Sequence, residues 1–390
     1  MKIAFVIPWY GNIPGGAESE CKRTAEKLQE RGIEVEVLTT CAKEFLSDWN
    51  TNYYRAGTYV VDGITVRRFP VRKRDTRRFD RINFKLMYDQ PISAEEELQF
   101  IQNMINSDHL YRYIAEHGRD FDFFIFIPYM FGTTYFGTKI YPEKSILIPC
   151  LHDESYARMR IFKPMFENVK GIVYLSNTEK DIANRLFSLK NAQEILGGGI
   201  DTNNSFNAER FKEKFKIKDE FILYAGRREP GKNVPLLIDY FCRYKNNNPS
   251  TLKLILIGSG EVNIPPNHQL DIIDLGFVSH QDKFDAYAAA TILCQPSVNE
   301  SFSIVIMESW LCETPVLVHA DCAATRDHCV KSNGGLFFKS YEEFEECVNY
   351  YIGNPKIRSE MADNGKKYVE KNYSWDFIIG GYIQFLTGVN

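Results

Sequence analysis

Two glutamates, Glu300 and Glu308, stand at the two ends of a short segment that begins a predicted helix. Glu300 follows a predicted strand and a Pro-Ser turn, and Glu308 comes about two helical turns later, beyond an apolar run typical of a buried helix face. The residues just after Glu300 would present backbone N–H groups at the helix N-terminus, where anions bind: Ser301, Phe302 and Ser303. Such a pattern suits a ligand with hydroxyls at both ends and phosphates between them. Taken alone, the pair fits equally well a helix-cap partner at Glu300 and a surface charge at Glu308.

A second polar cluster, YAGRREPGKN at 224–233, lies between a predicted strand and a predicted helix. Gly226 permits a tight exit from the strand, Arg227 offers a planar fork for phosphate oxygens, and Lys232 adds a point charge five residues later. Together these groups are suited to holding a diphosphate without a metal ion. Taken alone, basic residues on such a loop are more often solvated surface.

The elements that must position these residues alternate between apolar strands and amphipathic helices, which predicts an α/β protein with parallel sheets. A first series and a second series of strands are separated by the polar segment 201–220, which is the natural hinge. Two Rossmann-like halves are therefore expected. The predicted strands are 2–8, 34–39, 123–128, 145–149 and 171–175 in the first half, and 221–226, 252–258, 275–279, 291–296 and 315–320 in the second.

Length and composition narrow the class of protein. The 390 residues suffice for two domains, and the contents of 44% apolar and 25% charged residues are typical of a globular protein. The net charge of −4 gives no reason to expect nucleic acid as a partner. The nine cysteines are scattered without metal spacing, and neither a signal peptide nor an apolar run long enough to span a membrane is recognised. A cytoplasmic location with reduced thiols is expected.

With LIGSGE (256–261) and LGFVS (275–279) in the same order, these segments resemble the family-four retaining glycosyltransferases, within the glycosyl transferases group 1. The resemblance covers nearly the whole second half and implies the GT-B fold, two Rossmann-like domains facing across a cleft. It maps the family's paired-glutamate motif onto Glu300 and Glu308, and its Gly-Arg-x-x-x-x-Lys element onto Gly226, Arg227 and Lys232.

The resemblance also implies roles at the donor site. Arg227 and Lys232 would bind the donor pyrophosphate, Glu308 the ribose hydroxyls and Glu300 the donor sugar. Ser303 departs from the family pattern, which often has Gly or Pro at this position. The identity of the sugar therefore does not carry over from the family. Backbone that flanks the nucleobase is implied at Phe277 and Val278.

The first half carries weaker signals of the same resemblance. Gly15 and Gly16 resemble the family's Gly-Gly loop, which approaches donor and acceptor, although a plain tight turn is the alternative. His152, at the end of an apolar strand, resembles the family histidine that contacts the donor sugar; the alternative is a loop histidine bonded to local backbone. Asp153 and Glu154 are weaker candidates for the acceptor side, or caps of a helix.

Two other site classes fit the sequence poorly. A dehydrogenase is disfavoured because the dinucleotide-binding motif G-x-G-x-x-G is absent. In addition, the second strand does not end in the acid that would hold the ribose of NAD. Asp120 and Asp122 form a D-x-D pattern, but they precede their strand and would lie at the wrong edge of the sheet for a metal site. No metal ion and no cofactor are expected.

Residues 67–81 hold eight Arg or Lys in fifteen positions, and we interpret the stretch as a basic insertion at about 67–90. It is predicted to favour an anionic membrane or a phosphate-bearing acceptor, which would add peripheral contact at the inner face of the membrane. The alternative is a solvated or salt-bridged insertion. The expected domains are 1–200 on the acceptor side, 201–375 for the nucleotide sugar, and a terminal helix at 376–390 that returns to the first domain.

The combined hypothesis is a retaining, metal-independent glycosyltransferase that moves a sugar, expected to be a hexose, from a nucleotide-diphosphate sugar to an acceptor hydroxyl. The acceptor would be a carbohydrate or a lipid-linked molecule of cell-surface polysaccharide or glycolipid assembly. Its catalytic set would be His152, Glu300, Arg227 and Lys232. The alternatives are a nucleotide-sugar epimerase of the same fold and a non-catalytic nucleotide-sugar-binding protein.

Overall fold

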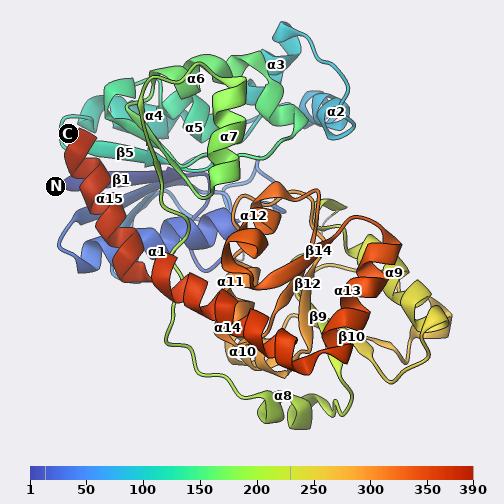
Figure 1. Cartoon of the computed structure of the whole chain (residues 1–390). Coiled ribbons are helices and arrows are strands. Elements are labelled where there is room, and N and C mark those ends of the chain that lie inside the picture. The colour runs from blue at the N-terminus through green and yellow to red at the C-terminus, as the bar shows by residue number, and fades with distance from the viewer. Residues whose placement is uncertain (14, 229, 390) are drawn as a thin grey trace. The chain divides into compact units, whose positions relative to one another are not determined.

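The computed structural model describes residues 1–13, 15–228 and 230–389, which form two compact units (Figure 1). Unit 1 comprises Met1–Gly199 and the C-terminal stretch from Ile378, and unit 2 comprises Ile200–Phe377. Each unit contains one predominantly parallel sheet with helices, so the chain is an α/β protein as predicted. The last position of the expected terminal segment, Asn390, lies outside the described residues.

Unit 1 is built on an eight-stranded sheet of order β3-β4-β2-β1-β5-β6-β7-β8. All neighbouring pairs are parallel except β3 and β4. Apolar runs such as the one at 3–7 form central strands because a parallel sheet is buried on both faces. The strands are β1 (Lys2–Ile7), β2 (Glu34–Thr40), β3 (Gly57–Val61), β4 (Ile64–Phe69), β5 (Phe123–Phe126), β6 (Ser145–Leu147), β7 (Gly171–Tyr174) and β8 (Ala192–Ile195).

The helices of unit 1 include α1, whose apolar stripe buries Cys21, Ala25 and Leu28 as its spacing predicts. The last helix, α15, begins in unit 2, and its residues from Ile378 on belong to unit 1. The helices are α1 (Gly16–Glu30), α2 (Thr76–Met87), α3 (Ala94–Gln102), α4 (Asp108–His117), α5 (Gly132–Gly137), α6 (Lys163–Asn168), α7 (Asn177–Leu186) and α15 (Trp375–Val389).

Unit 2 is built on a six-stranded parallel sheet of order β11-β10-β9-β12-β13-β14. Its strands are β9 (Phe221–Ala225), β10 (Lys253–Ile257), β11 (Ile272–Gly276), β12 (Ile292–Gln295), β13 (Val316–His319) and β14 (Gly335–Phe338). Its helices are α8 (Ala208–Phe215), α9 (Val234–Asn247), α10 (His280–Ala289), α11 (Ile304–Leu311), α12 (Ala323–Ser332), α13 (Tyr341–Gly353) and α14 (Pro355–Asn372).

The polar segment 201–220, expected to be only a hinge, contains helix α8. Phe211 of α8 is buried, and Arg210 pairs with the buried Asp285 of α10, with Nε and Oδ2 2.5 Å apart. Lys214 pairs with Asp282 of α10 in the same way, at 2.7 Å. The sequence of this segment is mostly polar because its charged side chains form these ion pairs or face solvent, while Phe211 and Ile217 are its buried apolar residues.

The proposed insertion at about 67–90 begins too early, because residues 67–69 are the end of strand β4. Burial alternates along β4, and Arg68 occupies an inward position beside Ile64 and Val66. Its guanidinium donates to the carbonyl oxygen of Tyr10 at 2.7 Å and lies 3.9 Å from the ring centroid of Tyr54. The sequence pattern missed the strand because an arginine stands where an apolar residue is expected.

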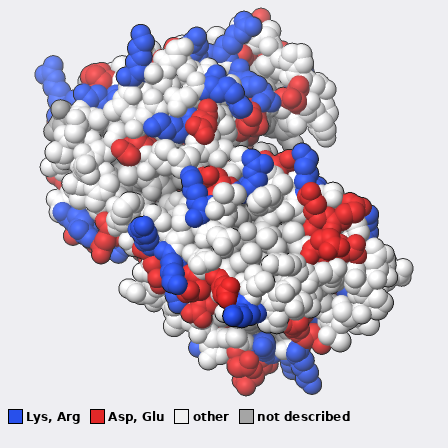
Figure 2. Space-filling view, viewed as in Figure 1, with Lys and Arg blue, Asp and Glu red and all other residues white. Residues whose placement is uncertain are grey.

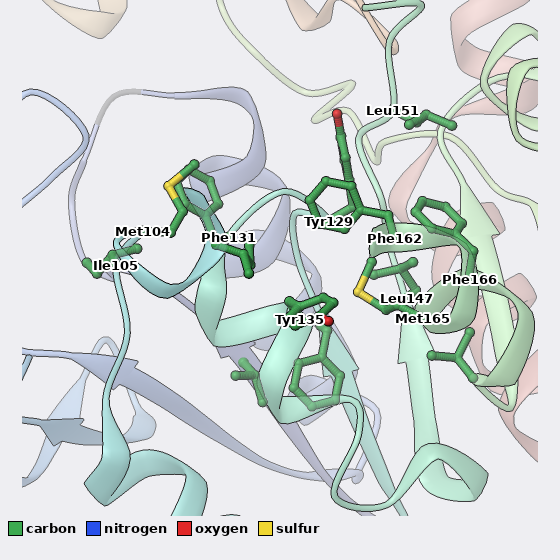
Figure 3. Packing of buried hydrophobic residues seen from close by; sticks show 14 of the residues in the cluster. Met104, Ile105, Tyr129, Phe131, Tyr135, Leu147, Leu151, Phe162, Met165 and Phe166 are labelled. Atoms are coloured by element: carbon green, nitrogen blue, oxygen red, sulfur yellow. The ribbon is translucent and has the colours of Figure 1, made fainter. Parts of the chain in front are cut away.

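Aromatic side chains fill the core of unit 1 beside strands β5 and β6 (Figure 3). The ring of Tyr129 packs edge-on against Phe162 with centroids 5.1 Å apart, and Phe166 and Leu147 join the same cluster. This packing holds the backbone just after β5 and β6.

Among the described residues, no helix combines the length and apolar character that crossing a membrane requires. Acidic and basic side chains are interspersed over the face seen in Figure 2.

Candidate active site

Three of the residues predicted to bind the donor lie on loops of unit 2 where the strand order of its sheet reverses. Strand β9 is followed in sequence by β10 on one side, whereas its other neighbour in the sheet is β12. In open α/β sheets, ligands bind outside the carboxyl ends of the strands at such a switch point. The loop after β9 carries Arg227 and Lys232, and the loop after β12 carries Glu300.

An ion pair joins these two loops. Lys232, at the end of a short 3-10 helix (Pro230–Lys232), places Nζ 2.7 Å from Oε1 of Glu300. The amide of Gln295, the last residue of β12, donates to the same oxygen at 3.4 Å. The side chain of Glu300 is only 10% exposed, so its charge is neutralised mainly by Lys232. The structure thus brings together two predicted site residues that lie far apart in the sequence.

Glycines allow the loops after β9 and β10 to pack backbone against backbone. The N–H of Gly226, which has a φ of 153°, donates to the carbonyl oxygen of Ile257 at 3.0 Å. A Cβ on Gly258 would lie 2.0 Å from the carbonyl oxygen of Gly226, so a larger residue there would displace the loop.

The two adjacent arginines of this loop, Arg227 and Arg228, have different surroundings. The guanidinium of Arg228 pairs with Asp274 and donates to the carbonyl oxygen of Gly260 at 2.8 Å, which ties the loop to its neighbours. Arg227 is half-buried, and its carbonyl oxygen accepts from the hydroxyl of Tyr224 at 2.6 Å. Arg228 therefore has a structural role, and Arg227 stays the residue that the sequence predicts to bind phosphate.

Ser301, Phe302 and Ser303 lead into helix α11 as expected. Phe302 is buried, and its ring lies 5.4 Å from that of His328 and 5.0 Å from that of Tyr373, between centroids. Ser303 is the N-cap residue, but it adopts a left-handed φ of 71° and its side chain makes no capping hydrogen bond. The family's frequent glycine at this position would adopt that conformation without strain.

Glu308 is buried on the inner side of α11, and the surface-charge alternative is therefore wrong. The ammonium of Lys283 on α10 lies 2.7 and 2.8 Å from its two carboxylate oxygens. The hydroxyl of Tyr287, also on α10, donates to Oε2 at 3.0 Å. Burial and the charge of Glu308 raise the pKa of Tyr287 well above its ordinary value, so this hydroxyl stays a donor.

Sequence reasoning missed Lys283 and Tyr287, although their spacing of four residues on a predicted helix places both on one face. That spacing alone did not show which element the face meets. Phe277 and Val278 lie just beyond the end of β11 rather than within a strand, and the side chain of Phe277 is 76% exposed.

In unit 1, Gly15 and Gly16 begin helix α1 as predicted. A Cβ on Gly15 would lie 2.0 Å from a carboxylate oxygen of Glu18, whose other oxygen accepts from the indole N–H of Trp9 at 2.6 Å. Apart from the chain neighbours of Gly16 and the nearby backbone of α1, no described atom lies within 4 Å of a Cβ built on Gly16. The space beside Gly15 is thus filled by the side chain of Glu18, whereas the space beside Gly16 would accept a side chain.

His152 lies in the loop after β6, with its side chain 27% exposed. Its Nδ1 is 3.8 Å from Oε1 of Glu154, and the hydroxyl of Tyr129 donates to that oxygen at 3.0 Å. Asp153 pairs with Arg158 at 2.8 Å and with Arg185 at 2.5 Å. These ion pairs give Asp153 a local structural role. His152 and Glu154 therefore stay the two candidate site residues of this loop, a base beside an acid.

The D-x-D pattern lies at the amino edge of the sheet of unit 1. Asp122 accepts a hydrogen bond from the backbone N–H of Lys2 at 2.7 Å, and Asp120 lies 3.0 Å from Nδ1 of His117. Within residues 1–13, 15–228 and 230–389, no cluster of three His, Cys, Asp or Glu side chains suited to a metal ion is present.

Five of the eight basic residues of 67–81 contact neighbouring parts of unit 1, the exposed Lys73 through the carbonyl oxygen of Asn50 at 2.8 Å. Arg67 pairs with Glu36 at 2.6 Å, and Arg68 is buried as described above. Arg72 pairs with Asp108, and Arg74 donates to the carbonyl oxygen of Asn103 at 3.1 Å. Except for Lys73, these side chains are therefore not part of one solvated basic surface.

The comparisons with known proteins find glycosyltransferases. Residues 205–368 match the family described as glycosyl transferases group 1. An uncharacterised glycosyltransferase of Methanocaldococcus jannaschii is 24% identical over 231 residues, 55% of this chain and 58% of that protein. An N-acetylgalactosaminyltransferase of Campylobacter jejuni, named for a diphospho-undecaprenol-linked acceptor, is 33% identical over 135 residues, 32% of this chain and 34% of that protein.

The likeness to solved structures extends over the whole chain. Anabaena HepE in complex with UDP-glucose has a TM-score of 0.70 at 15% identity, with all of both chains covered. At this identity the likeness shows the fold. With the family match over residues 205–368, it shows a glycosyl transferases group 1 region in unit 2 and the GT-B fold for the whole chain.

Proposed function

We propose that the chain is a retaining glycosyltransferase that moves a sugar from a nucleotide-diphosphate sugar to an acceptor hydroxyl. The observation that carries the proposal is the Lys232–Glu300 ion pair across the switch point of the unit 2 sheet. It joins the loop of Arg227 to the start of α11, where backbone N–H groups bind anions. A donor diphosphate would replace Glu300 as the counter-ion of Lys232.

In the proposed reaction, the acceptor oxygen forms a bond to the anomeric carbon while the bond from that carbon to the donor phosphate oxygen breaks. Arg227, Lys232 and the N–H groups before α11 stabilise the charge of the leaving diphosphate, each typically by a few kcal/mol. Glu300, released from Lys232, stabilises the positive charge that develops on the sugar. Attack from the face of the leaving group retains configuration, and the leaving phosphate oxygen takes the acceptor proton.

The donor and acceptor classes follow from chemistry and from the relatives. Uridine diphosphate sugars are the first donors to test because HepE was solved with UDP-glucose. A lipid-linked acceptor of polysaccharide or glycolipid assembly is supported by the name of the Campylobacter jejuni relative. The two curated relatives are matched over 58% and 34% of their length, so these substrates are proposed for this chain. The cytoplasm, where nucleotide sugars are made, is the proposed location.

A two-step experiment tests the proposal. A thermal-shift screen of nucleotide diphosphates and nucleotide sugars identifies the base, since a ligand that binds only the folded state raises the Tm. The donor found is then incubated with and without a panel of acceptors, and released nucleoside diphosphate is measured. Release that requires an acceptor, and that persists in excess EDTA, is the expected result.

Each alternative predicts a different result. An epimerase would convert the donor to another nucleotide sugar without any acceptor, which chromatography of the donor incubated alone detects. A binding protein would give a thermal shift but neither transfer nor slow donor hydrolysis. Loss of transfer in EDTA with recovery in magnesium or manganese would contradict the metal-independent reaction, because Arg227 and Lys232 would then not suffice for the diphosphate.

A further inference from the structure

Helix α2 divides the basic stretch of unit 1 into an inner and an outer part. Its inner side buries Phe79, Ile82 and Leu86, which are at most 5% exposed and follow helical spacing. The ring of Phe79 stacks on Phe100 of α3 with centroids 5.0 Å apart, and Lys85 pairs with Glu96 of α3 at 2.6 Å. The orientation of α2 is therefore fixed by packing within unit 1.

The opposite side of α2 exposes large apolar groups beside arginines. The side chains of Phe84, Met87 and Tyr88, at the C-terminal end of the helix, are 56%, 60% and 64% exposed, and the rings of Phe84 and Tyr88 lie 4.5 Å apart between centroids. Three arginines on the same helix are exposed, with one acid, Asp80, among them. We call this surface the outer face of α2: Arg77, Arg78, Arg81, Phe84, Met87 and Tyr88.

This surface differs from that of the neighbouring basic residues. Arg72 pairs with Asp108, and the guanidinium of Arg74 lies 4.7 Å from the ring centroids of Trp49 and Phe79. The arginines of the outer face are therefore the part of the basic stretch that is best exposed to a large partner. Clustered exposed apolar groups mark an interaction site, and arginines next to aromatic rings on one helix face are typical of helices that lie in a lipid interface.

The inner side of α2 also holds the segment that follows His152. The hydroxyl of Tyr156 donates to Asn83 at 2.7 Å, and the hydroxyl of Ser155 donates to the carbonyl oxygen of Leu86 at 2.5 Å. Asp89, just after the helix, pairs with Arg158 at 3.0 Å. One helix thus connects the exposed basic and apolar surface to the loop that carries the proposed acceptor-side residues.

We propose that the outer face of α2 docks on an anionic lipid bilayer. Phe84, Met87 and Tyr88 insert at the level of the headgroups, and the three arginines bind lipid phosphates. Anionic lipid is favoured over nucleic acid because the apolar groups need a non-aqueous environment and the chain has a net charge of −4. Docking would hold the segment 153–158 one helix away from the surface in which a lipid-linked acceptor resides. The docking itself does not depend on the proposed donor chemistry.

Co-sedimentation of the full chain with vesicles tests the proposal without donor or acceptor. Vesicles of phosphatidylcholine alone are compared with vesicles that contain phosphatidylglycerol, and binding is expected only to the second kind and to weaken with salt. Replacing Arg77, Arg78 and Arg81 with Ser should weaken binding by about two orders of magnitude. Replacing Phe84, Met87 and Tyr88 with Ser should also reduce it.

A matched charge control is the triple replacement of exposed lysines on α14 in unit 2 by Ser, at Lys356, Lys367 and Lys371. It removes the same charge and should leave lipid binding unchanged. In Tyr88→Trp, tryptophan emission should shift to shorter wavelength with anionic vesicles only. Circular dichroism and melting establish that each variant is folded.

Three results would overturn the proposal. One is equal binding of the wild type and the arginine variant, and another is an equal loss in the α14 control. The third is a concentration-dependent dimer, seen by sedimentation, that the apolar variant abolishes while lipid binding stays unchanged. In that case the outer face of α2 would be a contact between two copies of the chain.

Discussion

Glu179 in unit 1 and Glu308 in unit 2 are both nearly fully buried, on helices that follow strands of their sheets, yet they are held in opposite ways. The carboxylate of Glu179 accepts hydrogen bonds from the backbone N–H groups of Leu151 at 2.6 Å and Leu175 at 2.5 Å. The carboxylate of Glu308 is held by the side chains of Lys283 and Tyr287.

The difference distinguishes an acid that holds the local backbone from an acid that is a candidate for ligand binding. Main-chain donors cannot turn away, so Glu179 fixes the loop after β6, where Cys150 has a left-handed φ of 53° and His152 follows two residues later. Side-chain donors can turn, so Glu308 is able to exchange one of them for a hydroxyl of a ligand. A buried carboxylate surrounded by side-chain donors is thus the better candidate for binding.

The largest expected effect is on stability. Glu179→Ala leaves the N–H groups of Leu151 and Leu175 buried without an acceptor, which should cost about 2–6 kcal/mol at roughly 1–3 kcal/mol for each group. Hydrogen exchange should lose protection in peptides covering 150–152 and 171–176, and the Tm should fall. The exposed Glu116→Ala on α4 is the control, within about 0.5 kcal/mol of wild type. Unchanged protection of both peptides would mean that Glu179 does not hold this loop.

The second effect is a pH dependence of stability. Burial raises the pKa of Glu179 to about 8, although backbone N–H groups favour its charged form, and burial raises the pKa of Glu20 to about 7. Between the unfolded value of about 4.5 and about 8, the folded state therefore binds more protons than the unfolded state. Stability should be greatest at the low end of this range and fall as the pH rises, by an amount on the order of a few kcal/mol.

Glu179→Gln mimics the protonated acid and should flatten this dependence. The measurement is the urea midpoint of unfolding from about pH 5 to about pH 8.5, with Glu116→Gln as the control that keeps the wild-type slope. A slope unaffected by Glu179→Gln, or a stability that rises with pH in both proteins, would show that the acid is ionised in the folded state throughout.

The same two acids show how far sequence reasoning reaches. Ser176 and Glu179 have the spacing of a capping box, and its serine half forms, since the hydroxyl of Ser176 accepts from the N–H of Glu179 at 3.2 Å. The contact to Leu151 was not predictable, because it depends on β6 and β7 being neighbours in the sheet. Local signals thus locate the start of the helix, and the order of the strands determines what its side chains reach.

The candidate site shows the same limit. Spacing and residue types predicted the α/β class and most strands, and they selected Lys232, Glu300 and Glu308 as candidate site residues. The ion pair between Lys232 and Glu300 needs β9 beside β12, which periodicity does not encode. The end of β4 was missed because Arg68 is buried against a carbonyl and an aromatic ring, where pattern reasoning expects an apolar residue.

The third effect is kinetic and concerns the two acids of unit 2. If Glu308 binds the ribose, which does not change in the reaction, Glu308→Gln should raise the donor KM about tenfold, or about 1.4 kcal/mol, with a smaller change in kcat. If Glu300 stabilises charge on the sugar, Glu300→Gln should mainly lower kcat. Glu313→Gln, an exposed acid shortly after Glu308, is the control. The reverse pattern, or near-native constants in both variants, would refute the assigned roles.

The smallest expected effect comes from one donor to Glu308. Tyr287→Phe removes the hydroxyl that donates to Oε2 and leaves Lys283 in contact with both carboxylate oxygens. A typical net hydrogen bond contributes about 0.5–1.5 kcal/mol, so the donor KM should rise about twofold to tenfold, no more than in Glu308→Gln. Tyr244→Phe is the matched control, because it also removes a hydroxyl from a buried tyrosine of unit 2, here one that donates to Asn349 at 2.9 Å. An effect equal to that of Glu308→Gln would assign the carboxylate's orientation to Tyr287 rather than Lys283. An equal rise of the donor KM in Tyr244→Phe would mean that the effect of Tyr287→Phe is a general loss of stability in unit 2. The evidence that Glu308, unlike Glu179, can exchange its partners would then be lost.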